Sequence, residues 1–553
     1  MALIDHKGFR RGFPAAILLI AAVAAYGAMA YQALLHGPTS PDEVANLIRA
    51  WWYTSGVVKP YTATDATWSM PLYFFQLGWW QHLVGVGQFW GRAMSIGIGV
   101  LNGVLLFAIC NRLTANSLAS AGAVFVFLAT PATSFIFASA TPAATVSLLH
   151  LGAIWLIVTG LGRPRPWATV LLGLLLVALY FYRQNMILAA VVLGPLYIAG
   201  IGRKRALHAA VLIVVMALAT AALLYAFPHK LAEYAVRLPL IYGWLADAHL
   251  LSPNFVLIDR GATAPVSLDL AFNRFAAKDV YDFFLLPYGG TVILALALLA
   301  VVSGPLRILW AATLYFVWMI VTHLIGSLGF CRGCMVSYTP YFVGVGAVAC
   351  ALTLAMLARW ARQRGTSPAL AVIAVSVLVV TFNTFAPAGA FDPANKLFPL
   401  ARVVDMRATA MDAGESDALA RWVAANAPQR EPILLIPSRS DQRAMELPYA
   451  AFLAGHLIPP QSFDLARTHR VINAKLPAAQ KEAVQAAIEE ESLWSDETMK
   501  RWIEREYDLV IIQDDKTPAQ TALLGEIAAR FDQAGATTFR GASLLMFKRK
   551  PAQ

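Results

Sequence analysis

The stretch Thr39-Ser40-Pro41-Asp42-Glu43-Val44-Ala45 follows the first strongly apolar run of the sequence, Pro14 to Leu35. A helix can begin here, because Ser40 can cap it, Pro41 suits its first turn, and acidic residues are favoured after that turn. Two adjacent carboxylates at a membrane surface also suit chemistry, with Asp42 as a base that faces a membrane-embedded substrate. The rest of the sequence decides between a helix cap and a catalytic site.

The composition indicates the class of protein. Of the 553 residues, 58% are hydrophobic and only 14% are charged, which is too little charge for a soluble globular protein. Apolar runs close to the ~20 residues that a membrane helix needs recur along the chain. The net charge is +11, and the cations lie in short clusters between these runs, where the residues that set membrane topology are found. We therefore expect no nucleic-acid partner.

We predict a polytopic α-helical membrane protein with about eleven transmembrane helices. The first spans Pro14 to Leu35, and the others lie near residues 92–110, 119–137, 143–161, 167–182, 185–200, 207–227, 287–303, 308–328, 338–357 and 369–386. The basic residues at the N-terminus and those between later spans, such as Arg112 and Arg359, fall on one side of the membrane. The positive-inside rule makes that side cytoplasmic, and an odd number of spans places the C-terminus on the outer side.

The sequence divides near residue 386. Residues 1–386 form the predicted transmembrane domain, with outer loops at 36–91 and 228–286. In the first loop, an amphipathic helix from Asp42 to Val58 carries two tryptophans, which indicate that it lies in the membrane interface. The polar residues 387–553 show strand patterns at 432–437, 508–513 and 544–548, and helical patterns at 416–427, 478–491, 495–506 and 518–534. We predict that they form an α/β domain outside the membrane.

Several cations and their polar neighbours lie on the outer side, against the positive-inside bias. They are Lys59, Arg92, Arg183 with Gln184 and Asn185, and Arg332 followed by Tyr338. A cation in that position is unfavourable for topology, so each arginine is a candidate phosphate ligand. The alternative is that these arginines pair with outer carboxylates such as Asp65 or Glu43, or snorkel to the interface. We favour function for Arg183, because two polar side chains adjoin it.

A carboxylate beside several cations suits group transfer from a phosphate-linked donor. The carboxylate takes the proton from an acceptor hydroxyl, and the cations stabilise the charge that grows on the leaving phosphate. The sequence has no clean Ser/His/Asp arrangement, no glycine loop that would cradle a phosphate, and no His-rich metal motif. We therefore name no metal ligand, and use of a divalent cation stays open. Cys331 and Cys334 permit either a local disulfide or two free thiols.

The N-terminal half resembles that of the membrane glycosyltransferases with the GT-C fold. These include the protein O-mannosyltransferases and the bacterial aminoarabinose transferases that modify lipid A. The matching segments are Pro41-Asp42-Glu43 through Gly56-Val57-Val58, Met70-Pro71-Leu72-Tyr73-Phe74 and Phe89-Trp90-Gly91-Arg92, with a weaker return at Arg332 to Pro340. The resemblance implies that Asp42 is the base and that the donor is a polyprenyl-phosphate sugar.

Two positions depart from the family pattern. Met70 stands where many relatives have Lys or His before the Pro-Leu-Tyr-like segment, so another cation must hold the donor phosphate. The turn from Ser139 to Ala144 lacks the Asp that relatives often carry. Glu43 or Asp65 must then supply the second acid, if one is needed.

We expect a glycosyltransferase that moves a sugar from a polyprenyl-phosphate donor to a hydroxyl of a lipid, glycan or protein acceptor. It would work at the outer face of a bacterial inner membrane, among membrane lipids. Asp42 is the predicted base, Glu43 assists it, and Arg92, Arg183 and Arg332 hold the phosphate. The alternative is a transporter or flippase of a lipid-linked or anionic substrate. A third class is a structural envelope protein in which the acidic pair only caps a helix.

Overall fold

The computed structural model describes residues 6–36, 41–57, 60, 70–160, 165–201, 204–227, 314–323, 335–385, 413–427, 431–436, 446–456, 496–514, 516, 518–539 and 542–551. The predictions that lie outside these residues concern Lys59, Asp65, Arg332, the two cysteines Cys331 and Cys334, the loop at 228–286, the span at 287–303 and the helix at 478–491.

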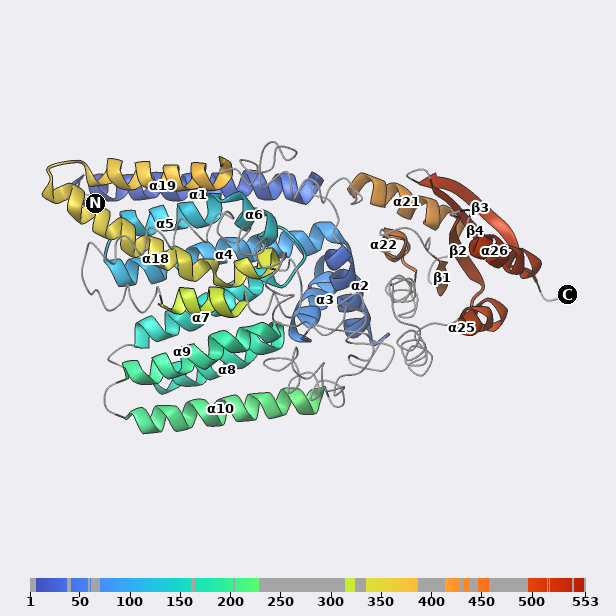
Figure 1. The fold of residues 1–553 in the computed structure, drawn as a ribbon, viewed down its shortest axis with the longest axis horizontal. Helices are drawn as coiled ribbons and strands as arrows, with labels where there is room; N and C mark the ends of the chain where they lie inside the picture. Colours follow the sequence, from blue (N-terminus) through green and yellow to red (C-terminus); the bar gives the residue numbers. More distant parts are fainter. Residues whose placement is uncertain are drawn as a thin grey trace, which may run out of the picture.

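A bundle of apolar helices makes up the larger part of the protein (Figure 1). Its long members are α1 (His6–His36), α4 (Gln88–Thr114), α7 (Ala143–Gly160), α10 (Arg205–Ala226) and α18 (Met335–Gln363). Its shorter members are α5 (Ser117–Ala129), α8 (Pro166–Tyr182), α9 (Ile187–Gly200), α19 (Pro368–Phe385) and the helix Leu314–His323. By length and composition, 5 helices in the described part of the chain can cross a membrane. The protein is therefore a polytopic helical membrane protein.

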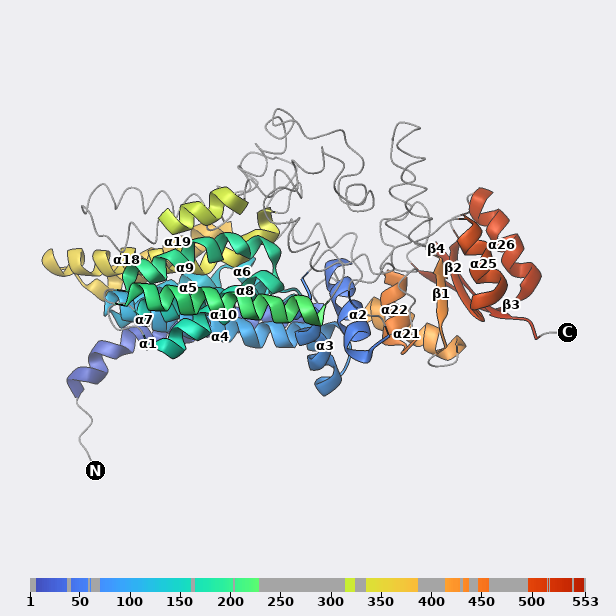
Figure 2. The ribbon, with the colours of Figure 1, turned by 90° about the horizontal axis from the view of Figure 1, so that it is seen from below.

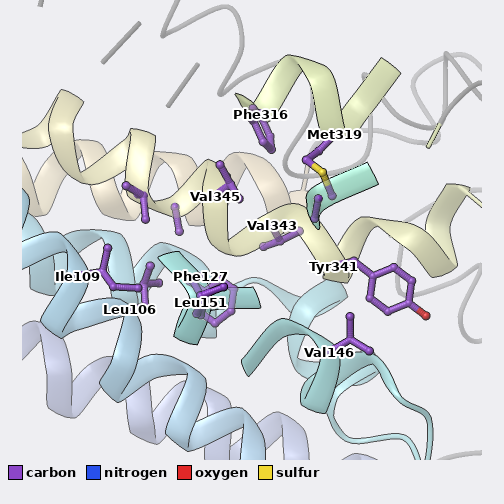
Figure 3. Packing of buried hydrophobic residues seen from close by; sticks show 14 of the residues in the cluster. Leu106, Ile109, Phe127, Val146, Leu151, Phe316, Met319, Tyr341, Val343 and Val345 are labelled. Carbon is purple, nitrogen blue, oxygen red and sulfur yellow. The ribbon is translucent and has the colours of Figure 1, made fainter. Parts of the chain in front are cut away.

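The core of the bundle joins helices that are far apart in the sequence. Leu106 of α4, Phe127 of α5 and Leu151 of α7 pack together, and Phe316 and Val343 close the cluster from the helix Leu314–His323 and from α18 (Figure 3). Tyr341 lies at the edge of this cluster, and its hydroxyl points away from the other labelled side chains (Figure 3).

The predicted span 119–137 is divided in the structure. Helix α5 ends at Ala129 and α6 (Pro131–Phe137) follows it, with Thr130 between them in an extended conformation (φ −78°, ψ 123°). Pro131 explains the break, because it has no N–H to donate and its ring disfavours a helical backbone in the preceding residue. The turn after α6 carries Ala140, whose backbone reaches α2.

Helices α2 (Pro41–Ser55) and α3 (Leu72–Val84) lie across one end of the bundle, between it and the C-terminal domain (Figures 1 and 2). We call this the outer end. The sequence predicted that α2 lies in the membrane interface as an amphipathic helix. The structure buries both of its faces, because α3 and α4 cover one side and α22 (Glu446–Leu453) packs on the other. The polar residues Glu43 and Arg49 are only 1% and 5% exposed.

The C-terminal residues form a four-stranded sheet with the order β1-β2-β4-β3. β1 (Ile433–Ile436) is parallel to β2 (Leu509–Asp514), and β4 (Ala542–Arg549) is antiparallel to both β2 and β3 (Phe531–Phe539). Strands β1, β2 and β4 are where the sequence predicted them. The helix predicted at 518–534 is wrong at its end, because α26 (Pro518–Arg530) stops where β3 begins. β3 is an edge strand with one buried residue, so it has no alternating apolar pattern to reveal it.

The sheet domain packs on the crossing helices of the outer end. Its helices α21 (Ala413–Asn426) and α22 share a hydrophobic cluster with α2 and α3, and α25 (Asp496–Arg501) and α26 cover the other face of the sheet. The Tyr449 hydroxyl of α22 accepts a hydrogen bond from the Gln88 backbone N–H at 2.8 Å. The ring of Phe452 lies 6.5 Å from that of Trp51, centroid to centroid. The domain thus contacts both α2 and the first turn of α4.

The close contact of α2 with α3 requires glycine at position 78. A Cβ atom there would overlap the carbonyl oxygen of Ala50 and crowd Thr54, and a backbone atom cannot move aside as a flexible side chain can. We expect Gly78→Ala to lower the free energy of unfolding by about 1–3 kcal/mol. The measurement is the midpoint of thermal unfolding in detergent, followed by tryptophan fluorescence.

The matched control is Gly97→Ala on α4, where a Cβ atom meets nothing within 4 Å. This variant should be neutral or slightly more stable, because alanine is the better helix former by about 1 kcal/mol. Equal unfolding midpoints for the two variants would contradict the packing that we describe.

Candidate active site

Two charges buried at the outer end form an ion pair. Glu43 comes from the first turn of α2 and Arg92 from the start of α4. The Arg92 Nε atom lies 2.9 Å from Glu43 Oε1, and Nη2 lies 2.7 Å from Oε2. Both residues are at most 3% exposed. A pair buried this deeply stabilises a protein only when its geometry is good and its remaining polar atoms are satisfied.

Groups from three other places complete this pair. The backbone N–H of Ala140 donates to Glu43 Oε1 at 2.8 Å, and Arg92 Nη1 donates to the Ala33 carbonyl at 2.6 Å. Asn46 Nδ2 donates to the Ala140 carbonyl at 3.1 Å. We call these five residues the Glu43–Arg92 clamp. The clamp joins the end of α1, α2, α4 and the turn between α6 and α7, so Arg92 has the pairing that the sequence analysis held as an alternative to phosphate binding.

Asp42 has a different environment from its neighbour. Successive residues of a helix are rotated by about 100°, so Asp42 cannot share the inward direction of Glu43. Its side chain is exposed, and its charge acts on the hydroxyl of Tyr341 at the start of α18. The two acids that the sequence places side by side are therefore separated by the turn of the helix.

Arg183 approaches the same tyrosine from another helix. It follows the last residue of α8 in an extended conformation (φ −154°, ψ 114°), and its guanidinium carbon lies 5.9 Å from the centroid of the Tyr341 ring. Its charge acts on the Tyr341 hydroxyl and on His323. The charges of Asp42 and Arg183 thus both act on the Tyr341 hydroxyl, and the Arg183 guanidinium also lies near the Tyr341 ring.

A buried histidine, His150, links Tyr341 to the neighbouring helix through hydrogen bonds. His150 of α7 has Nδ1 at 2.7 Å from the Tyr341 carbonyl oxygen and Nε2 at 2.6 Å from the Tyr315 hydroxyl. Because a carbonyl only accepts, Nδ1 carries the proton and Nε2 accepts from Tyr315. Tyr341, His150 and Tyr315 were not predicted from the sequence, because their partners lie on other helices and no local pattern marks them.

Some buried polar atoms at the outer end have no hydrogen-bond partner in the described structure. They include Oε1 of Gln184 and both amide atoms of Asn185, in the turn Gln184–Met186, and the Tyr73 hydroxyl, Gln76 Oε1 and Gln81 Oε1 in α3. Buried polar atoms are nearly always paired in native proteins, so atoms left unpaired here indicate a place for a polar ligand. Gln184 and Asn185 were predicted from sequence, whereas Tyr73 appeared only within a motif and Gln76 was missed.

The structure therefore describes some of the predicted site residues and not others. Six of the predicted residues have described side chains, and all six lie at the outer end of the bundle. They are Asp42, Glu43, Arg92, Arg183, Gln184 and Asn185. Tyr338 lies in the first turn of α18, and only its backbone is described. In the described part of the chain, no group of three or more His, Cys, Asp or Glu residues could hold a metal ion.

The clamp can be tested by removing one of its charges. Glu43→Gln keeps the shape of the side chain but leaves Arg92 without a counter-charge in a dry environment, so we expect the free energy of unfolding to fall by about 3–5 kcal/mol. The control is Glu526→Gln, which breaks the exposed pair with Lys500 at 3.7 Å and should cost at most about 1 kcal/mol. Thermal unfolding in detergent measures both, and a similar small effect of the two changes would argue against the clamp.

The backbone was compared with known proteins. No protein-family model matches this sequence, and a comparison with curated proteins finds no match. The structure of ArnT from Cupriavidus metallidurans bound to undecaprenyl phosphate matches with a TM-score of 0.55 and 13% sequence identity, over 98% of each chain. The apo structure of the same protein matches with a TM-score of 0.56 and 12% identity, over 96% of this chain and 97% of that one.

A third structure, the apo form of the Archaeoglobus fulgidus oligosaccharyltransferase, has a TM-score of 0.47 and 11% identity, over 92% of this chain and 70% of that one. The match to ArnT extends over nearly the whole of both chains, bundle and sheet domain together. The chain therefore has a GT-C membrane glycosyltransferase fold, as its N-terminal motifs predicted.

Proposed function

We propose that this protein is a glycosyltransferase that moves a sugar from a polyprenyl-phosphate donor to a hydroxyl of a lipid, glycan or protein acceptor. The observation that carries the proposal is that an exposed acid, Asp42, and a cation, Arg183, both act electrostatically on Tyr341, with the guanidinium 5.9 Å from the ring centroid. A base and a cation for the departing phosphate are the two groups that transfer from a phosphate donor needs. The ArnT structure with a matching fold is bound to undecaprenyl phosphate, which supports a lipid phosphate as the donor.

In this proposal Asp42 removes the proton from the acceptor hydroxyl. The acceptor oxygen then attacks the anomeric carbon of the donor, while the bond from that carbon to the phosphate oxygen breaks. A single displacement of this kind inverts the configuration at the anomeric carbon. The Arg183 guanidinium donates hydrogen bonds to the phosphate, whose charge grows as it leaves. Gln184 and Asn185 supply further amide groups beside it.

The other predicted residues take supporting roles in the proposal. Glu43 and Arg92 orient the first turn of α2, and so Asp42, through the clamp. Four further residues stay candidates for substrate binding: Lys59, Asp65, Arg332 and Tyr338. A second cation is wanted for the phosphate, because Met70 stands where many relatives have Lys or His.

We further propose that the outer end faces the periplasm of a bacterial inner membrane. The described cations at the opposite end of the bundle include Arg112 in the last turn of α4, Arg165 before α8, Lys204 before α10 and Arg205 as its first residue, Arg359 and Arg362 near the end of α18, and Arg364 just after it. By the positive-inside rule, that end is cytoplasmic. Residues 1–386 would then form the catalytic membrane domain, and residues 387–553 the periplasmic domain.

The base is tested by Asp42→Asn, which is nearly isosteric. Because the amide cannot accept the proton, we expect transfer to fall by about 10²–10⁴-fold, while the unfolding midpoint stays unchanged. The readout is mass spectrometry of lipids and glycans from cells that express the variant in place of the native protein. The control is Asp532→Asn on the exposed edge strand β3, which should keep full activity. Full activity of the Asp42 variant would remove the assignment of the base.

The phosphate ligand is tested by Arg183→Ala. Loss of the guanidinium should weaken binding of undecaprenyl phosphate to the purified protein by about 10- to 100-fold, since charge-assisted hydrogen bonds are lost. Arg364→Ala is the control, because that arginine lies over the Trp360 ring at the other end of the bundle. An affinity that is the same in the Arg183 variant and the native protein would exclude Arg183 as a phosphate ligand.

A further inference from the structure

Tyr73 is a buried residue whose hydroxyl has no well-formed hydrogen bond in the described structure. It is the second residue of α3 and is 2% exposed, and within the described structure its hydroxyl makes no hydrogen bond of good geometry. The Ser95 hydroxyl, which donates to the Gly91 carbonyl at 3.2 Å, also interacts with the Tyr73 hydroxyl. Burial raises the pKa of Tyr73 well above its ordinary value, and the nearby charge of Glu43 adds to this effect. The hydroxyl therefore stays protonated and can donate.

Gln76 adds a second unpaired atom on the same face of α3. Residues three apart in a helix lie on one side, so Gln76 follows Tyr73 one turn later. Its Nε2 atom makes a long contact of 3.8 Å with the sulfur of Met94, and its Oε1 atom is buried without a partner. The two residues thus present one hydroxyl donor and one amide acceptor side by side.

This face of α3 is next to the reaction site of the proposed function. The Tyr73 hydroxyl is within electrostatic range of Tyr341, on which the charges of Asp42 and Arg183 act, and of Tyr182, the neighbour of Arg183. It is also within range of Glu43, whose charge is balanced by Arg92. The α3 side therefore offers neutral polar atoms and aromatic rings, whereas the α8 side offers a cation.

The chemistry of these atoms selects the ligand. A phosphate only accepts hydrogen bonds, so it would leave the Gln76 carbonyl unpaired. A sugar hydroxyl both donates and accepts, so adjacent hydroxyls of one ring can satisfy Tyr73 and Gln76 together.

We propose that Tyr73 and Gln76 form the subsite that binds hydroxyl groups of the transferred sugar, while Arg183 binds the phosphate. This inference rests on the proposed function, and it assigns recognition of the sugar to α3. A site with buried polar atoms discriminates strongly against a ligand that leaves them unpaired.

The test compares binding of undecaprenyl phosphate with binding of the same lipid phosphate that carries mannose, glucose or N-acetylglucosamine. The full-length protein is titrated in detergent. The native protein should bind the sugar-bearing forms more tightly, the best of them by about tenfold, which is the worth of one or two net hydrogen bonds. Tyr73→Phe and Gln76→Leu should each reduce this preference to about twofold or less and leave the affinity for bare undecaprenyl phosphate unchanged.

The stability of the variants separates binding from folding. Tyr73→Phe removes a hydroxyl that makes no hydrogen bond of good geometry in the described structure, so the unfolding midpoint should change little. Tyr197→Phe is the matched control: its hydroxyl lies 2.7 Å from Thr169 Oγ1 between α9 and α8, so its loss should lower the midpoint and leave the preference for sugar intact.

Three results would overturn the inference. If Tyr73→Phe and Gln76→Leu leave the preference intact, α3 does not bind the sugar. If they weaken bare and sugar-bearing lipid equally, these residues serve the phosphate or the fold. If the native protein binds bare undecaprenyl phosphate but gains nothing from a sugar, the subsite is wrong while the proposed donor class stands. Failure of the native protein to bind any of these lipids would reject the proposed function itself.

Discussion

The buried ion pair of Glu43 with Arg92 is the interaction on which the outer end of this protein depends. Removing two charges from water costs several kcal/mol per ion, and the cost is offset here by a two-pronged contact and by hydrogen bonds to the Ala140 N–H and the Ala33 carbonyl. These partners come from α1, α4 and the turn after α6. A pair with such partners fixes both the position and the rotation of α2.

The rotation of α2 decides what its two acids can do. With Glu43 turned into the protein, Asp42 is left on the side of Tyr341, where the Arg183 guanidinium lies over the ring. Helices α7, α18 and Leu314–His323 support this place from the bundle side through the hydrogen bonds of His150. The sheet domain supports it from the other side, since Tyr449 bonds to the backbone at the start of the helix that carries Arg92.

The resulting site has two chemically different sides. The α8 side carries a guanidinium followed by the amides of Gln184 and Asn185, which suits an oxyanion. The α3 side carries the neutral hydroxyl of Tyr73 and the amide of Gln76, which suits a polyol. A phosphate-linked sugar has this same division, with a charged and a neutral part joined by the bond that transfer must break.

The sequence by itself determined the class of protein, several of the apolar helices and three of the four strands, because apolar length, positive clusters and strand patterns are local properties. The sequence also predicted Asp42, Arg183, Gln184 and Asn185 as site residues, because a charge or amide at a membrane boundary is unusual and can be recognised without knowing its partner. Only the tertiary structure decided which acid is buried, that Arg92 belongs to Glu43, that the charges of Asp42 and Arg183 both act on Tyr341, and that residues 531–539 form a strand. Each of these depends on a partner from a distant segment, and the rotation and packing of the helices that bring such partners together leave no local pattern in the sequence.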